Sequence, residues 1–240
     1  MGERESYPPG TFSWADLGTT DAEAAKAFYT KVFGWEAAGS RFDLEGKAVA
    51  ALHEAGEPGW SSYVTVEDVD AVVAKARELG GEVPEEPRDV PETARTAAVK
   101  DPAGSLVHLW QPQGHQGAAR VNEPGCMVWN ELATPDLDTA RTFYRGLFGW
   151  TLEAEDGTGY EVIRTGGALN GGLRTPQEDE PPHWLVYFTA PVSCEQTAGV
   201  VREAGGRVLA GPMDTGVGRI AVVADPQGAT FALFEGKIDP

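Results

Sequence analysis

Cysteine is scarce in this sequence, and so is positive charge. Among 240 residues there are two cysteines, Cys126 and Cys194, with no CxxC motif and no spaced His/Cys cluster. This pattern is typical of a reducing compartment and excludes a zinc site built from thiolates. Nineteen Lys and Arg stand against 37 Asp and Glu, which gives a formal net charge of -18. Such an acidic surface repels phosphate backbones and anionic lipids, so we expect no nucleic-acid and no membrane partner.

Long hydrophobic runs are also missing. The first six residues have no apolar core for a signal peptide, and no run reaches the length of a transmembrane helix. Together with the cysteine content, this predicts a cytoplasmic protein. The rest of the composition, 41% hydrophobic and 9% aromatic, is ordinary for a globular chain.

What the sequence does contain is an internal repeat. Three segments of the first half return in the second half: Trp14–Asp21 as Trp129–Asp136, Phe28–Trp35 as Phe143–Trp150, and Asp101–Gly104 as Asp225–Gly228. The offset is 115 residues for the first two pairs and 124 for the last, so insertions separate the matched elements. The chain therefore holds two copies of one domain. We predict domains at 10–112 and 125–237, with 113–124 as the linker.

Each copy is predicted to fold as strands around two helices. Asp21 and Asp136 are typical N-caps, and the apolar residues behind them follow the spacing of one buried helix face. Second helices are expected near Val69–Leu79 and Val192–Ala204. The expected strands are Arg41–Glu45, Ala48–His53, Ser61–Val66, Thr96–Val99, Leu106–Trp110, Tyr160–Arg164, Trp184–Thr189, Arg219–Val223 and Thr230–Phe234. With a turn at each Asp-Pro-x-Gly motif, each copy is βαβββ twice over, which makes four modules.

These motifs resemble the vicinal oxygen chelate superfamily. The resemblance rests on Thr-x-Asp before a helix, Phe-Tyr-x-x-x-Phe-Gly-Trp, Gly-Gly-x-Val, and Asp-Pro-x-Gly before a final strand, over roughly 12–111 and 125–236. It implies an α+β fold in which paired modules curl into an open cup. The superfamily includes glyoxalase I, extradiol dioxygenases and bleomycin-resistance proteins. Because this scaffold supports many different reactions, the resemblance predicts the fold and leaves the reaction open.

The resemblance also implies where a metal would be held: by inward side chains near the start of the first strand and in the last strand of each module. The corresponding residues are Trp14, Ala51, Ser61 and His108 in copy one, and Trp129, Gly171, Leu185 and Ala232 in copy two. A metal needs three or four lone-pair donors. Among these residues only His108 is a plausible metal ligand. An alignment error of a residue or two would add at most His53 or His183. We expect no metal cofactor, with Fe, Mn, Ni or Zn as the alternative.

Aromatic and acidic side chains are expected on the inner faces instead. Because side chains alternate along a strand, Trp14 shares a face with Asp16, and Trp129 shares one with Glu131. The same alternation completes the predicted ligand-binding set with Tyr63, Trp110, Tyr187 and Phe234. Such residues suit a flat or cationic organic ligand, although each Trp has core packing as its alternative. An inward carboxylate needs an arginine, a ligand or solvent as its partner.

Three functions follow from this set of residues. The first is a metal-free small-molecule-binding protein that sequesters an antibiotic or another toxic aromatic or cationic compound. The second is a glyoxalase-like lyase, isomerase or oxygenase, with His108 as the catalytic group or as a hydrogen-bonded wall residue. The third is an interaction protein with filled cups. The expected partner is a small organic ligand, with the two copies paired in one chain as a monomer or homodimer.

Overall fold

The computed structural model describes residues 2–155 and 157–237. Copy one contains β1 (Phe12–Thr19), α1 (Ala22–Phe33), β2 (Glu36–Ala38), β3 (Arg41–Leu44), β4 (Lys47–Glu54), β5 (Gly59–Thr65), α2 (Val69–Glu78), β6 (Glu82–Val90), β7 (Ala94–Lys100) and β8 (Leu106–Pro112). Copy two contains β9 (Met127–Ala133), α3 (Leu137–Phe148), β10 (Thr151–Glu155), β11 (Tyr160–Thr165), β12 (Ala168–Arg174), β13 (His183–Thr189), α4 (Cys194–Glu203), β14 (Arg207–Thr215), β15 (Gly218–Ala224) and β16 (Thr230–Gly236).

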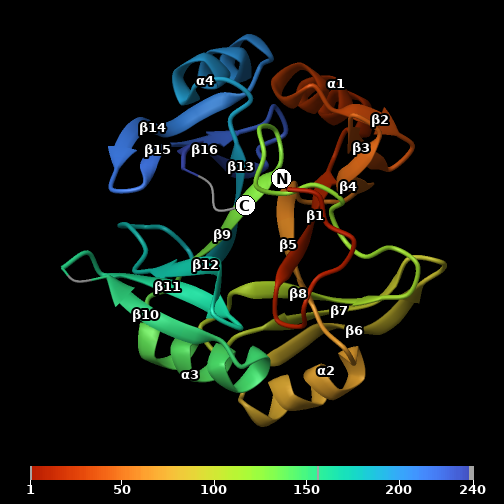
Figure 1. Cartoon of the computed structure of the whole chain (residues 1–240), viewed down its shortest axis with the longest axis vertical. Helices are drawn as coiled ribbons and strands as arrows, with labels where there is room; N and C mark the ends of the chain where they lie inside the picture. Colours follow the sequence, from red (N-terminus) through yellow and green to blue (C-terminus); the bar gives the residue numbers. More distant parts are fainter. Residues whose placement is uncertain (1, 156, 238–240) are drawn as a thin grey trace.

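Each copy forms one curled sheet of eight strands (Figure 1). The strand orders are β2-β3-β4-β1-β5-β8-β7-β6 and β10-β11-β12-β9-β13-β16-β15-β14. In both sheets the first strands of the two modules pair antiparallel at the centre, and the last strand of each module runs parallel to its first. The prediction of two tandem α+β domains, each made of two βαβββ modules that form an open sheet, is confirmed.

Helices α1 and α3 begin and end at the residues that their caps predict. The carboxylates of Asp21 and Asp136 each accept a hydrogen bond of 3.0 Å from the backbone N–H three residues later. Gly34 and Gly149 end the helices in the left-handed region, with φ of 74° and 70°. Helix α4 begins two residues later than predicted because Ser193 forms a capping box at its N-terminus.

No residue bounds were predicted from the sequence for β2, β6, β10, β12 or β14. Strands β6 and β14 contain Pro84, Pro87 and Pro212, which break the alternating pattern of a strand. Both lie at an edge of their sheet, where a missing N–H donor is tolerated. Strand β12 contains the pair Gly171-Gly172. Glycine has a low β-propensity, so the sequence pattern does not indicate a strand there.

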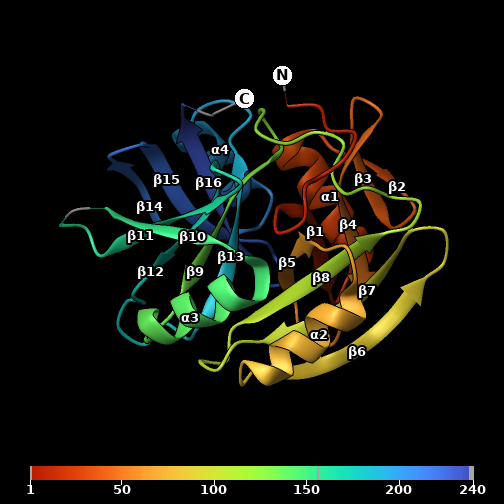
Figure 2. The same ribbon diagram turned by 60° about the horizontal axis from the view of Figure 1, so that its bottom comes forward.

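The two copies pack together through their helices and cores. Helix α1 lies beside α4 and α2 beside α3, at opposite ends of the molecule in Figure 1, and Figure 2 brings the second pair forward. One hydrophobic cluster is built mainly from the first and fourth modules and the other mainly from the second and third. Each of these two clusters, with the modules that form it, makes one layer of the molecule. Each layer therefore contains one module from each copy.

Matched hydrogen bonds join the copies in both layers. The Tyr29 hydroxyl donates to Oδ2 of Asp225 over 3.1 Å, and the Tyr144 hydroxyl donates to Oδ2 of Asp101 over 3.0 Å. Oδ1 of each aspartate accepts backbone N–H groups of its own turn. The helix motif of one copy thus binds the Asp-Pro-x-Gly turn of the other, so these repeated motifs serve the fold.

The two repeated tryptophans that follow the first helix of each copy act in the same way. Nε1 of Trp35 donates to the carbonyl of Gly125 over 2.8 Å, and Nε1 of Trp150 donates to the carbonyl of Gly10 over 2.7 Å. Both glycines lie just before the first strand of the other copy. Both indoles are buried, so these tryptophans are core residues that fix how the copies meet.

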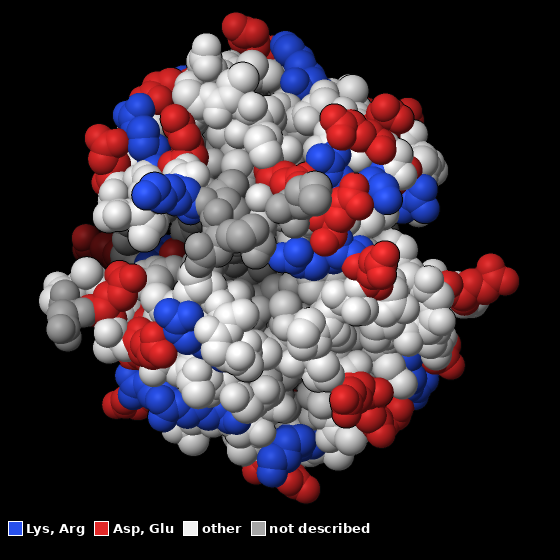
Figure 3. All heavy atoms as spheres, viewed as in Figure 1, with Lys and Arg blue, Asp and Glu red and all other residues white. Residues whose placement is uncertain are grey.

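Acidic side chains surround the face seen in Figure 3, with Lys and Arg between them. This distribution matches the net charge of -18. Among the helices of the described ranges, none is long and apolar enough to span a membrane.

Candidate ligand sites in the two cups

Two rows of side chains line the concave face of each sheet, because directly paired residues of neighbouring strands share a face. We call these faces cup one (copy one) and cup two (copy two). The long row of cup one is Trp14, Tyr63, His108, Ala98 and Glu85. The long row of cup two is Trp129, Tyr187, Ala232, Val222 and Ala210. The short rows are Trp110, Thr96 and Arg88 in cup one, and Phe234, Ile220 and Met213 in cup two.

The two inward carboxylates lie beside the long rows, and each meets a cation from the neighbouring strand. Oδ1 of Asp16 is 3.2 Å from Nδ1 of His53. Nε of Arg174 donates to Oε1 of Glu131 over 2.7 Å. The sequence required a partner for each carboxylate, and the structure supplies both from within the chain.

Strand register makes these two ion pairs equivalent. Ala51 lies opposite Asp16, and Gly172 lies opposite Glu131. The cation stands two residues further along the strand in each copy. The expected counterpart of Ala51 was Gly171, so the alignment from sequence was wrong by one residue, because the glycines of β12 gave no pattern to fix its register.

His108 is buried in the long row without a hydrogen bond. Its side chain is 8% exposed and packs on the Tyr63 ring, with ring centroids 4.8 Å apart. Within residues 2–155 and 157–237 its imidazole forms no hydrogen bond, and its nitrogens are not among the fully enclosed polar atoms that lack a partner, so they reach solvent. Burial lowers the pKa of His108, although the negative charges of Glu85 and Asp16 oppose this. The ring is therefore neutral at neutral pH, with nitrogen lone-pair capacity that the fold does not use.

One end of cup one is closed by the linker and the N-terminal segment. The His115 ring lies 4.6 Å from the Trp14 ring, centroid to centroid, and the His115 carbonyl accepts a 3.0 Å hydrogen bond from Nε1 of Trp110. The Tyr7 hydroxyl donates to the carbonyl of Ala118 over 2.6 Å. Trp14 is consequently only 3% exposed. Most of the surface of this indole is therefore packed as in a core residue, which was the alternative to a ligand-binding role.

Cup two presents an apolar face instead. Leu185, Tyr187, Ala232 and Phe234 form their own cluster, against which Trp129, Ile220 and others pack partly buried. Met213, which lies opposite Ile220 on the neighbouring strand, is 42% exposed. The large hydrophobic side chains that the described chain leaves exposed all lie in copy two: Leu169, Val192, Leu209, Met213 and Val217.

A polar cluster stands at the edge of cup two. Nε1 of Trp129 donates to the Tyr160 hydroxyl over 2.8 Å. Burial and the charge of Glu131 raise the pKa of Tyr160 and of Tyr187 above their ordinary value, so both phenols stay protonated. The guanidinium of Arg174 binds Glu180 as well as Glu131, and its hydrogen bonds lower the pKa of Glu180 to about 2. This ties segment 175–182 to the cup.

The donors present do not suit the metal that the family's enzymes hold. At the family's positions cup one offers the indole of Trp14 and the hydroxyl of Ser61 beside His108, and cup two offers an indole and hydrocarbon. Within the described ranges, no three His, Cys, Asp or Glu side chains come close enough to hold a metal ion together.

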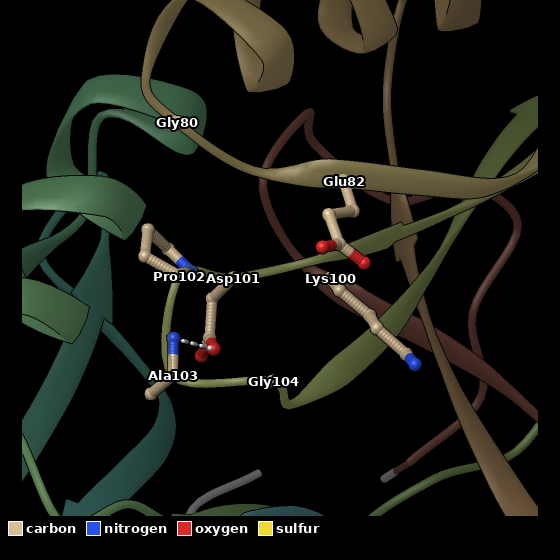
Figure 4. Close-up of a pocket in the computed structure, with 7 residues that line it drawn as sticks. All are labelled: Gly80, Glu82, Lys100, Asp101, Pro102, Ala103 and Gly104. Carbon is tan, nitrogen blue, oxygen red and sulfur yellow. Dashed lines mark hydrogen bonds between the residues drawn. The ribbon is translucent and has the colours of Figure 1, made fainter.

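A hollow of about 270 Å³ lies outside both cups, at the turn before β8. Gly80, Glu82 and Lys100 line it together with the Asp101–Gly104 turn (Figure 4). Figure 4 shows Asp101 joined to the backbone N–H of Ala103, while the Lys100 side chain extends away. Since Asp101 also accepts from Tyr144 across the interface, its carboxylate serves the fold.

Sequence reasoning placed the predicted ligand-binding residues on the inner faces but missed several neighbours. It did not assign His53 or Arg174 to the inward carboxylates, and it treated His115 as linker only. The pairing of β4 with β1 and of β12 with β9 is parallel, so these contacts join residues about 40 positions apart. The one available signal was the rule that an inward charge needs a partner.

Comparison with known proteins supports the fold at the level of both sequence and structure. The family model described as Glyoxalase/Bleomycin resistance protein/Dioxygenase superfamily matches residues 11–109 and 126–233. Among solved structures, the Mn(II)-bound glyoxalase from Novosphingobium aromaticivorans has a TM-score of 0.68 at 19% identity, over 98% of this chain and 84% of that one. The 2,3-dioxygenase LapB from Pseudomonas sp. KL28 has a TM-score of 0.65 at 18% identity, over 97% and 95%. At these identities the likeness concerns the fold alone.

Relatives at higher identity span nearly the whole chain. A protein of Mycobacterium tuberculosis named "Putative glyoxylase CFP32" is 40% identical over 98% of this chain and 98% of its own length. The anthracycline biosynthesis protein DauV of Streptomyces sp. (strain C5) is 32% identical, over 95% of this chain and 94% of its own. The tandem arrangement is therefore shared along the full length of these relatives.

Proposed function

The chain belongs to the Glyoxalase/Bleomycin resistance protein/Dioxygenase superfamily, and we propose that it binds a flat, largely apolar organic molecule in cup two without a metal ion. The observation that carries this proposal is the apolar inner face of copy two, a buried cluster beside which Met213 is 42% exposed. Met213 lies opposite Ile220 and extends the surface formed by Trp129, Tyr187 and Phe234. Concave apolar surface with a few polar groups at its edge is what small-molecule sites are made of.

The charges in cup two limit the class of ligand that it can bind. Glu131 is neutralised by Arg174, so no free carboxylate is left to attract a cation. The remaining polar groups are the protonated phenols of Tyr160 and Tyr187, which hydrogen-bond neutral oxygen atoms. Trp129 offers a ring face for stacking. Of the flat or cationic ligands that the sequence suggested, these contacts favour a neutral aromatic one.

The relatives add a chemical class to this expectation. DauV and DnrV, the latter of Streptomyces peucetius, are named anthracycline biosynthesis proteins. The aglycone of an anthracycline is a flat, fused-ring quinone with phenol and carbonyl oxygens, which matches a cup with an aromatic face and phenol donors. Tight binding of such a compound would sequester it, and this is the role that we assign to the protein.

Calorimetric titration with an uncharged anthracyclinone tests the proposal. We expect one equivalent to bind per chain, with the same affinity before and after treatment with a chelator. Trp129→Leu should weaken binding about tenfold, which corresponds to about 1.4 kcal/mol, because a stacking face is lost. The matched variant Trp14→Leu should leave the affinity unchanged. Two results contradict the proposal. One is binding that is lost when a chelator removes a stoichiometric metal; the other is binding that Trp14→Leu abolishes and Trp129→Leu does not change.

A lyase, isomerase or oxygenase activity is the second candidate function, and one observation favours it. His108 is a buried imidazole without a hydrogen bond to the described protein, at the position where the family's enzymes carry a functional side chain. It lies in cup one, so the two candidate functions concern different sites.

A further inference from the structure

We propose that segment 175–182 is a flap at the rim of cup two, that the ion pair between Arg174 and Glu180 holds this flap closed, and that the flap has to open before a ligand enters or leaves the cup. The inference rests on the proposed function, because it concerns the regulation of the same site.

The connection that forms the flap is longer in copy two than in copy one. In copy one, β4 ends at Glu54 and β5 begins at Gly59, so the four residues 55–58 join them. In copy two, β12 ends at Arg174 and β13 begins at His183, so the eight residues 175–182 join the equivalent strands. The fold makes this connection with four residues in copy one and does not need the extra length. Surplus length in a surface loop is where function is commonly added.

Both ends of the flap lie on the inner face of cup two. Ala133 stands two residues after Glu131 on β9, so their side chains share a face. Arg174 and His183 each lie opposite Ala133, on the two strands that flank β9. Because directly paired residues share a face, the side chains at the start and at the end of the flap point into the cup.

Glu180 fastens the flap to this inner face. Its two carboxylate oxygens accept hydrogen bonds of 2.7 and 2.6 Å from Nη1 and Nη2 of Arg174. Nε of the same guanidinium binds Glu131 inside the cup over 2.7 Å. The Glu180 and Arg174 side chains are only 20% and 23% exposed. A two-pronged, half-buried pair of this kind is stronger than an ordinary surface ion pair, and it joins the flap to the inner carboxylate.

Little else holds the flap down. Within residues 2–155 and 157–237, the hydrogen bonds of segment 175–182 reach only Arg174, His183 and the segment itself. Most of its residues are exposed: Thr175, Gln177, Glu178, Asp179 and Pro181. A segment with few buried contacts opens at low cost once its main attachment breaks. The Arg174–Glu180 pair therefore decides how often the flap is open.

The flap is fastened beside the groups that we assign to the ligand. Tyr160 lies opposite Arg174, and its hydroxyl accepts the hydrogen bond of Trp129. A Cβ at Gly172 would lie 2.0 Å from this hydroxyl, so the Tyr160 ring lies over β12, the strand that leads into the flap. Closure of the flap therefore takes place next to the stacking face and the phenol of the site.

Copy one has the inner ion pair without the flap. His53 stands where copy two has Arg174, and it pairs with Asp16. Within the part of the chain that the structure describes, no side chain of residues 55–58 binds His53. The attachment of a loop to the inner ion pair is thus specific to the copy whose cup is apolar, which is the copy that we expect to hold the ligand.

Amide hydrogen exchange tests the flap without a ligand. Mass spectrometry follows the exchange of segment 175–182 in the parent and in two variants. Glu180→Gln should speed this exchange at least about fivefold, because one charge of the pair is lost. Glu178→Gln, which removes the same charge from an exposed residue of the same segment, should exchange as the parent does. Equal exchange in all three proteins overturns the proposal.

Stopped-flow mixing with an uncharged anthracyclinone tests control of entry and departure. In Glu180→Gln the association and dissociation rate constants should each rise about fivefold with the affinity unchanged within about twofold, because opening precedes both steps. Glu178→Gln should keep both parent rates. Unchanged rates in Glu180→Gln, or a faster dissociation alone, contradict the flap and leave the proposed function standing. If the parent binds no anthracyclinone, the proposed function fails; faster exchange in Glu180→Gln then still supports the closed flap, and equal exchange overturns it.

A shortened flap provides a second variant. Deletion of residues 177–180 leaves a connection of the length that copy one uses, so the chain should fold, which thermal unfolding checks. Association and dissociation should be at least as fast as in Glu180→Gln, because nothing is left to close the rim. Parent rates in the folded deletion variant overturn the proposal.

Discussion

Position by position, cup one carries charged and titratable groups where cup two carries hydrocarbon. Glu85 and Arg88 of cup one stand opposite Ala98 and Thr96, whereas Ala210 and Met213 of cup two stand opposite Val222 and Ile220. His108 of cup one corresponds to Ala232 of cup two in the long row. The order of strands and helices is the same in both copies, and so are the Tyr–Asp and Trp–glycine hydrogen bonds between them. The repeat therefore fixes the scaffold, and the inner rows decide what each cup can take.

The ends of the two cups differ as well. The linker and the N-terminal segment close cup one over Trp14, and Trp129 of cup two is only partly buried. Linker residue His115 reaches cup one because the linker continues directly from β8. This difference teaches that a matched tryptophan can be core in one copy and accessible in the other.

The largest expected effect comes from giving cup two the charges of cup one. The double variant Ala210→Glu, Met213→Arg should weaken binding of an anthracyclinone about 100-fold, or about 2.7 kcal/mol, because ligand burial would desolvate two charges. Calorimetry measures the affinity, and thermal unfolding checks that the sheet edge tolerates a replacement at half-buried Ala210 and at exposed Met213. The reciprocal variant Glu85→Ala, Arg88→Met in cup one is the matched control and should bind as the parent does. Comparable losses in the two variants would mean that the cups are not distinct.

A second prediction concerns what the copies still share. Tyr29→Phe and Tyr144→Phe should each lower the free energy of unfolding by about 1–3 kcal/mol, because each leaves a buried aspartate oxygen without its donor. Chemical denaturation measures both. Equal losses support one interface used twice; a loss in only one variant would show that the two layers are not equivalent.

Acid should affect cup two in a defined direction. The pKa of Glu180 is lowered to about 2 in the folded chain by Arg174, below its ordinary value. Its contribution to stability is therefore present above its unfolded pKa and is lost as the pH falls through the folded pKa. Glu180→Gln should lower stability at neutral pH by about 1 kcal/mol, and the difference from the parent should vanish only below about pH 2. A difference that grows toward acid pH has the wrong sign for this account.

The smallest effect is expected at the closed end of cup one. His115→Gly should shift tryptophan emission slightly to the red, because Trp14 and Trp110 lose a covering ring. The unfolding temperature should change little, since the backbone hydrogen bonds of the linker remain. An unchanged spectrum would mean that another group covers these indoles.

Much of the fold follows from the sequence because the repeat marks every module twice. The Phe-Tyr helix, the Asp caps and the Asp-Pro-x-Gly turns were all visible as residues. The edge strands β6 and β14 were not, because prolines interrupt their pattern, and with them Arg88 and Met213 went unassigned to the cups. The partners His53 and Arg174 also required knowledge of parallel register, which no local pattern gives. Inner-face residues were thus predictable one strand at a time, and their neighbours across the sheet were not.

A crystal structure of the chain with an anthracyclinone would show directly which cup holds the ring system. The account predicts the ring system in cup two, stacked on Trp129 and in contact with Met213, with an oxygen near Tyr160 or Tyr187. Cup one should hold none of it, with His115 still against Trp14. A ring system found in cup one, with the His115 segment displaced, would contradict the division between the cups.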